Sequence, residues 1–199
     1  EVYGQFVPFR DMLTLCREAG NADMVYEFAS TSKITFPGAG VAVMAASEAN
    51  LKYLSGLLGA QTISYDKVNQ LRHVRFLQDK AHVLELMQRH AAILRPKFEA
   101  VLAALRGIAP LNIASWTEPK GGYFVSCDAM PGTAKRTLAL CAGAGVTMTP
   151  AGATYPGGND PADSNIRIAP SFPPVEELEQ AMQIFCLALR MAALEKLGI

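Results

Sequence analysis

The stretch that decides the fold is residues 25–46, which read VYEFASTSKITFPGAGVAVMAA. Its first five residues have the aromatic and β-branched character of a short strand. A polar loop that contains Lys33 follows, and turn-forming residues close this loop at 37–40. The apolar run 41–46 has the length of a buried strand. We therefore expect a lysine that projects from the end of one strand, in a loop that leads into a second strand.

Lys33 is the first candidate for a chemical role. A free lysine amine is protonated at neutral pH and is then a poor nucleophile, but a desolvated amine can attack a carbonyl group. Backbone and hydroxyl donors surround this lysine in a loop rich in serine and threonine. The position is suited to a Schiff base with a carbonyl cofactor, and a solvated loop lysine is the ordinary alternative.

Helices and strands alternate on both sides of this loop. Residues 11–19 have helical composition, and Ser47 begins a helix that extends to about Leu58. Strands that alternate with helices predict a mixed or parallel sheet.

A long helical pattern follows. From about Tyr65 to Leu105, apolar residues recur at steps of three and four, which predicts one long amphipathic helix. We expect Pro96 to kink this helix, because proline removes a backbone hydrogen bond, and Gly107 to end it.

Shorter elements are expected beyond Gly107. Residues 165–169 alternate in polarity, so that Ile166 and Ile168 face one side of a strand and Arg167 the other. The remaining expected elements are strands over 112–117 and 123–127, a helix over 133–142, and a last helix that starts at Pro173-Pro174. Together these elements predict a small α+β region.

The composition excludes several classes of protein. Half of the 199 residues are hydrophobic, and 18 Lys+Arg balance 18 Asp+Glu, so the chain is globular and shows no charge pattern for nucleic acid or anionic lipid. No apolar run approaches the roughly 20 residues that a membrane span needs. The N-terminus lacks a basic segment, so we expect no signal peptide and interpret the chain as part of a longer one.

The cysteines and histidines show no metal-site spacing. The four cysteines lie far apart among apolar neighbours, which indicates buried free thiols in a reduced, cytoplasmic protein. The three histidines lie in the predicted long helix without an i, i+4 pair, so we expect surface or interface residues and no metal.

Residues 30–41 resemble the cofactor-lysine segment of fold-type I pyridoxal-phosphate-dependent aminotransferases, and most of all a bacterial aspartate aminotransferase-like branch. In that family the lysine binds the cofactor as a Schiff base, and the serine three positions earlier contacts its phosphate. The resemblance therefore assigns these roles to Lys33 and Ser30, with Ser32 and Thr35 as further cofactor contacts. Most of the family has a phosphate-clamping arginine eight positions after the lysine, where this chain has Val41.

Three further segments resemble the same family. Residues 1–3 resemble the end of a segment whose tyrosine contacts the phenolic oxygen of the cofactor, which assigns that role to Tyr3. Residues 119–124 resemble a hairpin that approaches the substrate, which makes Tyr123 a candidate contact. Residues 164–169 resemble a strand whose arginine binds the α-carboxylate, which points to Arg167, and a planar guanidinium matches a carboxylate.

The resemblance implies an α/β fold: the rear part of a large cofactor domain, with a mixed sheet and helices, and a smaller α+β C-terminal domain. The expected parts are the large-domain region 1–75, a linking helix over 76–106 and the small domain 107–199. It also implies a homodimer that transfers an amino group between an amino acid, such as aspartate or another dicarboxylic one, and a 2-oxo acid. We expect the 199-residue chain alone to be inactive.

Two alternatives remain open at this point. One is a cofactor-binding effector domain of an aminotransferase-like transcription regulator. The other is a lyase or decarboxylase of the same fold that uses the same cofactor.

Overall fold

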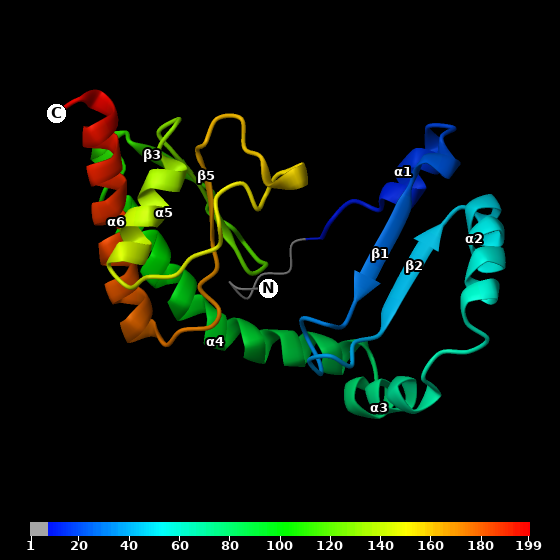
Figure 1. The fold of residues 1–199 in the computed structure, drawn as a ribbon. Helices are drawn as coiled ribbons and strands as arrows, with labels where there is room; N and C mark the ends of the chain where they lie inside the picture. The colour runs from blue at the N-terminus through cyan, green and yellow to red at the C-terminus, as the bar shows by residue number, and fades with distance from the viewer. Residues whose placement is uncertain (1–7) are drawn as a thin grey trace. The chain divides into compact units, whose positions relative to one another are not determined.

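A computed structural model describes residues 8–199, so Tyr3 lies outside the described part of the chain. These residues form two compact units, called here the N-terminal unit, up to Met87, and the C-terminal unit, Gln88–Ile199 (Figure 1). The boundary between the units falls inside one helix, α4 (Lys80–Arg106). No helix within residues 8–199 combines the length and the apolar character that crossing a membrane requires.

The N-terminal unit contains a strand pair and three α-helices. Its helices begin at polar caps: the side chains of Asp11, Ser47 and Asp66 accept hydrogen bonds from backbone N–H groups of the first turns. Its elements are α1 (Met12–Glu18), the 3-10 helix η1 (Ala22–Met24), β1 (Tyr26–Ser30), β2 (Ala42–Ala46), α2 (Glu48–Gln61) and α3 (Lys67–Leu77). The predicted strand, lysine loop and second strand are thus confirmed.

The strands β1 and β2 pair antiparallel, from Tyr26 opposite Ala46 to Ser30 opposite Ala42 (Figure 1). The expected mixed or parallel sheet is therefore not found among the described residues, where both sheets are antiparallel. The reason is the length of the connection: residues 31–41 form a loop without a helix. A parallel pair would need a crossover of a dozen or more residues.

The predicted single long helix is wrong, because the chain breaks it into α3 and α4. Gln78 adopts a left-handed backbone, with φ 54°, and ends α3. Asp79 then accepts a hydrogen bond from the backbone N–H of His82 at 3.0 Å, as an N-cap does at a helix start. Pro96 lies inside α4, which ends at Arg106, directly before Gly107 as predicted.

The C-terminal unit is built on a three-stranded antiparallel sheet in the order β3-β4-β5. Its elements after α4 are η2 (Ala109–Leu111), β3 (Ala114–Trp116), β4 (Val125–Ala129), α5 (Ala134–Gly143), η3 (Pro156–Gly158), β5 (Asn165–Ile168) and α6 (Val175–Leu197). Ile166 and Ile168 are buried, whereas Arg167 lies on the other face of β5, as the alternation predicts. The core packs β4 and β5 against α4 and α6 through residues such as Phe98, Val125, Ile166 and Phe185.

Burial differs sharply between the two units. Within residues 8–87, His73 is the only buried residue, and it is 5% exposed. The histidines were expected to be surface or interface residues, and His73 is instead buried within the N-terminal unit, against the loop that carries Lys33. Phe28 and Val43, on the strand pair, are 75% and 62% exposed. The N-terminal unit has almost no core of its own.

Three of the cysteines are buried free thiols, as predicted, and Cys16 is partly exposed. Burial raises the pKa of Cys127 to about 12 and that of Cys186 to about 11. Such thiols remain protonated at neutral pH and serve as apolar core groups rather than as nucleophiles.

Candidate functional site

The lysine predicted to be catalytic lies in a tight turn directly after β1. The backbone N–H groups of Ile34 and Thr35 both donate to the carbonyl oxygen of Thr31, at 3.0 and 2.9 Å. This pattern makes one helix-like turn, with Lys33 exposed near its middle. The strand end and the turn together position the amine.

Two serines shortly before Lys33 in sequence have hydroxyls that lie together in space. The hydroxyl oxygens of Ser30 and Ser32 are 2.5 Å apart, and the backbone N–H of Ser32 donates to the Ser30 hydroxyl at 3.1 Å. Both serines are exposed. The structure thus brings together two of the predicted cofactor contacts, the Ser30 and Ser32 hydroxyls, in the turn that carries Lys33.

The loop closes so tightly that Gly40 has no room for a side chain. A Cβ atom at this position would lie 2.5 Å from the Ser32 hydroxyl oxygen and 3.1 Å from the Ser32 Cα. Two hydrogen bonds between Thr31 and Val41 close the loop. The backbone N–H of Thr31 donates to the carbonyl oxygen of Val41, and the backbone N–H of Val41 donates to the hydroxyl of Thr31, both at 2.9 Å. Val41, where most of the family has an arginine, therefore contributes its backbone to the loop.

A histidine that the sequence did not point to lies behind this turn. His73 Nε2 is 3.1 Å from the hydroxyl oxygen of Thr31 and 2.9 Å from that of Thr35. The Thr35 hydroxyl is also within donor distance of the Thr31 carbonyl, at 3.0 Å, so this predicted cofactor contact is engaged inside the loop. The sequence signal for His73 was its spacing of four from Asn69, which places both side chains on one face of α3.

The donor set around Lys33 fits a cofactor that combines a carbonyl group with a phosphate. A primary amine can bind a carbonyl carbon covalently, and hydroxyl groups are suitable donors to phosphate oxygens. The glycine at position 40 lets the hydroxyl pair approach the loop backbone without obstruction. Lys33, Ser30 and Ser32 are the described residues that could hold such a group.

A second group of predicted residues lies in the C-terminal unit, around Arg167 on β5. The guanidinium carbon of Arg167 lies 4.5 Å from the centre of the Phe124 ring, a cation–π arrangement. Its buried Nε atom has no hydrogen-bond partner, and within residues 8–199 no carboxylate forms an ion pair with this arginine. A structural salt bridge, the ordinary role for such an arginine, is thus not found in this part of the chain.

An acidic residue on the same sheet face as Arg167 already has another hydrogen-bond partner. Asp128, on β4, accepts a hydrogen bond at 2.7 Å from the amide of Asn165, which also donates to the Ser126 hydroxyl at 2.9 Å. Thr154 donates to the remaining amide oxygen of Asn165 at 2.7 Å. This network holds β4 and β5 in register beside Arg167 and leaves the guanidinium for another anion.

Tyr123 lies in the hairpin between β3 and β4, next to Phe124. It is half-buried, and this burial raises the pKa of its phenol. The phenol therefore remains protonated at neutral pH and can act as a hydrogen-bond donor.

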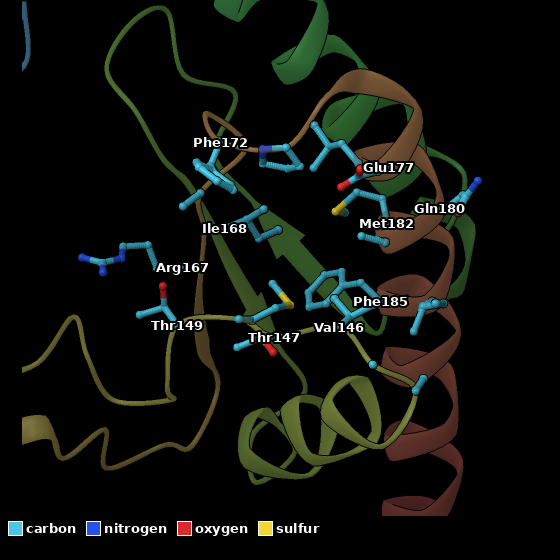
Figure 2. A pocket seen from close by; sticks show the side chains of 18 residues that line it. Val146, Thr147, Thr149, Arg167, Ile168, Phe172, Glu177, Gln180, Met182 and Phe185 are labelled. Carbon is cyan, nitrogen blue, oxygen red and sulfur yellow. The ribbon is translucent and has the colours of Figure 1, made fainter.

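Arg167 also borders an apolar pocket of about 530 Å³, but its charged group does not enter it. Figure 2 shows Ile168, Met182 and Phe185 inside this pocket, between β5 and α6, whereas the guanidinium of Arg167 points away from α6. The guanidinium of Arg167 therefore lies outside this pocket.

The predicted site residues thus form two groups, Lys33 with Ser30, Ser32 and Thr35 in the N-terminal unit, and Arg167 with Tyr123 in the C-terminal unit. Within residues 8–199, no group of three or more His, Cys, Asp or Glu side chains is arranged to hold a metal ion.

Comparisons with known proteins agree on one family. Residues 1–198 match the aspartate amino-transferase family. The chain is 47% identical over 194 residues to a Mycolicibacterium smegmatis protein provisionally named an aminotransferase, covering 97% of this chain and 45% of that protein. It is 45% identical over 192 residues to an aspartate aminotransferase of Corynebacterium glutamicum, covering 96% of this chain and 44% of that protein. The chain therefore spans about half the length of the curated relatives it matches.

Solved structures share the fold. The crystal structure of an aspartate transaminase from Corynebacterium glutamicum has a TM-score of 0.94 and 43% identity, covering 98% of this chain and 46% of that one. LysN, an α-aminoadipate aminotransferase from Thermus thermophilus in complex with N-(5'-phosphopyridoxyl)-L-leucine, has a TM-score of 0.76 and 24% identity, covering 96% of this chain and 48% of that one. This second likeness concerns the fold alone.

Proposed function

Because this chain belongs to the aspartate aminotransferase family, we propose that it forms part of an enzyme that transfers an amino group between an amino acid and a 2-oxo acid, with pyridoxal phosphate as cofactor. The observation that carries the proposal is the turn after β1, where Lys33 lies beside the paired hydroxyls of Ser30 and Ser32. This cofactor requires an amine for its carbonyl group and hydrogen-bond donors for its phosphate, and one turn contains both.

Each residue near the turn has a distinct role in the proposal. Ser30 and Ser32 donate hydrogen bonds to the phosphate, and Lys33 holds the cofactor through its amine. Thr35 is a further contact in the proposal, acting from inside the loop. Tyr3, outside the described residues, would contact the phenolic oxygen of the cofactor.

Lys33 also moves a proton. Pyridoxal phosphate, when bound, supplies an electron sink for the charge that develops at the α-carbon of the amino acid. With the substrate bound, the Lys33 amine would serve as the base for the α-carbon. It can then accept the α-proton and return it at another position, which is the general acid–base step of the reaction.

Arg167 binds the substrate in this proposal. Its guanidinium is held against Phe124 and has no carboxylate partner within residues 8–199, which supports a role in gripping the α-carboxylate. Tyr123, as a protonated phenol in the neighbouring hairpin, is a second substrate contact. Aspartate or another dicarboxylic amino acid is the proposed substrate, supported by the 45% identity to the Corynebacterium glutamicum enzyme of that name.

The organisation of the whole protein is part of the same proposal. We assign residues 1–75 to the large cofactor domain, 76–106 to a linking helix and 107–199 to the small domain of a homodimer. The buried free thiols of the C-terminal unit support a reduced, cytoplasmic environment.

The test is chemical trapping at Lys33 in the complete protein that carries this chain. The protein is loaded with pyridoxal phosphate, reduced with borohydride, digested and mapped by mass spectrometry. A phosphopyridoxyl label on Lys33, together with amino transfer from aspartate to 2-oxoglutarate, is expected, and Lys33→Ala should abolish both. Lys52→Ala, an exposed lysine of α2, is the matched control. A label at another lysine, or an unchanged label in Lys33→Ala, would refute the proposal.

A further inference from the structure

We propose that His73 is a positioning residue for Lys33: by holding Thr31 and Thr35, it fixes the turn from which the catalytic amine projects. This inference rests on the proposed function, because it concerns the same lysine.

The geometry of the turn places the two threonines on one side and Lys33 on the other. Thr31 and Thr35 are four residues apart in a helix-like turn, so their side chains lie on the same side. Each residue of such a turn rotates by about 100°, so Lys33 is about 200° away from Thr31. The lysine therefore leaves the turn on the side opposite to His73, and His73 can act on it only through the turn.

His73 is itself rigidly held. Its Nδ1 lies 2.9 Å from the carbonyl oxygen of Asn69, and because a carbonyl only accepts, Nδ1 carries the hydrogen. In the neutral ring, the single lone pair of Nε2 then accepts from one threonine hydroxyl at a time: that of Thr31, or that of Thr35 in place of its bond to the Thr31 carbonyl. The edge of the ring packs against Phe36, with ring centres 5.4 Å apart and planes at 81°. A buried imidazole with both nitrogens satisfied has a single favourable orientation.

The same face of α3 also holds the far end of the loop. The side-chain amide of Asn69, one helical turn before His73, donates to the carbonyl oxygen of Ala39 at 2.8 Å. One helix face thus holds the loop at Thr31 and Thr35, which precede and follow Lys33, and again at Ala39 near the end of the loop. The strands β1 and β2 are mostly exposed, so the strand pair alone restrains the turn weakly. The two attachments to α3 restrain it further.

The experiment compares two histidines of the N-terminal unit in the complete protein loaded with pyridoxal phosphate. His73→Leu removes the hydrogen bonds to the turn, and His73→Gln keeps an amide that can reach the threonines. His82→Leu is the matched control, because His82 is exposed and contacts Asp79 at the start of α4. The readouts are kcat, the pH midpoint of the visible absorption band of the lysine-bound cofactor, and hydrogen exchange at the Ile34 and Thr35 amides.

We expect His73→Leu to lower kcat by about 10- to 100-fold, since a small displacement of a catalytic group has an effect of that size. The pH midpoint of the band should shift, and the Ile34 and Thr35 amides should exchange faster. His73→Gln should lie between His73→Leu and the wild type in all three readouts. His82→Leu should match the wild type.

A double-mutant cycle keeps the proposal testable even where His73→Leu folds poorly. If His73 acts through Thr35, the loss caused by Thr35→Val should be much smaller when His73 is already alanine, which has no group that can bond the threonines. Additive losses would show that the two residues act independently and would overturn the proposal. It would equally be overturned by a His73→Leu protein with a lower Tm but unchanged kcat, band midpoint and exchange.

Failure of this inference is distinguishable from failure of the proposed function. If the wild-type protein shows borohydride-trapped label at Lys33 while the His73 variants behave like the wild type, only the role of His73 is refuted. If the wild-type protein shows no label at Lys33, the proposed function itself falls, and the role of His73 with it.

Discussion

The guanidinium of Arg167 stacks on the ring of Phe124, 4.5 Å from its centre, so the hairpin before β4 and the strand β5 meet through a cation and an aromatic face. The stack orients the planar donor group without using its N–H donors for a protein carboxylate. An arginine held in this way is prepared to bind an external carboxylate with two parallel hydrogen bonds.

Replacing Arg167 should therefore affect the substrate and not the cofactor. Loss of a charge-assisted contact costs about 2 to 4 kcal/mol, so Arg167→Ala should lower kcat/KM for the amino acid by roughly 30- to 1000-fold. The visible absorption of bound cofactor and the Tm should stay near the wild-type values. Steady-state kinetics, absorption spectra and thermal unfolding on the same preparation check this. Unchanged kinetics, or a joint loss of Tm and cofactor, would contradict the carboxylate role.

Replacing Phe124 tests the stack. The ring is 45% exposed, and an exposed cation–π contact contributes about 0.5 to 1 kcal/mol. Phe124→Leu should therefore reduce kcat/KM by about 2- to 5-fold with little change in kcat, because the guanidinium is less well oriented before substrate binds. Phe124→Tyr keeps an aromatic face and is the control. Equal kinetics for the leucine and tyrosine variants would show that the stack does not contribute to kcat/KM.

Gly40→Ala should disrupt the Lys33 loop. The new methyl group would overlap the Ser32 hydroxyl and crowd the Ser32 backbone, so the loop must open. We expect weaker retention of pyridoxal phosphate, measured by dialysis and absorption. Gly59→Ala in α2 is the matched control: nothing lies within 4 Å of its Cβ, and an alanine in a helix interior is stabilising by about 0.5 to 1 kcal/mol. Full retention in the Gly40 variant would contradict the close packing of this loop.

The sequence predicted the elements whose signals are local. The run before Lys33, the alternation around Arg167 and the prolines that start the last helix are each signals of neighbouring residues, and the structure has each element close to where it was expected. The break between α3 and α4 was missed because the apolar spacing continues across it. The local signal was Asp79, a good N-cap residue that lies just before the first turn of α4.

Contacts between distant segments could not be predicted in the same way. His73 was expected to be a surface or interface residue, because helical spacing gives its face on α3 but not which segment packs against that face. Its burial depends on Thr31 and Thr35, about 40 positions earlier in the chain. The stack of Phe124 on Arg167 likewise joins two elements whose pairing only the folded sheet reveals.

The uneven burial of the two units has a consequence for how the chain acquires its structure. Every buried residue among positions 8–199 except His73 lies in the C-terminal unit. Cooperative unfolding depends on buried apolar contacts, so in a chain of these 199 residues alone the C-terminal unit should exchange its core amides only through global opening, whereas the N-terminal unit opens locally. In that chain the Lys33 loop should become ordered after the core of the C-terminal unit, although it precedes this core in sequence.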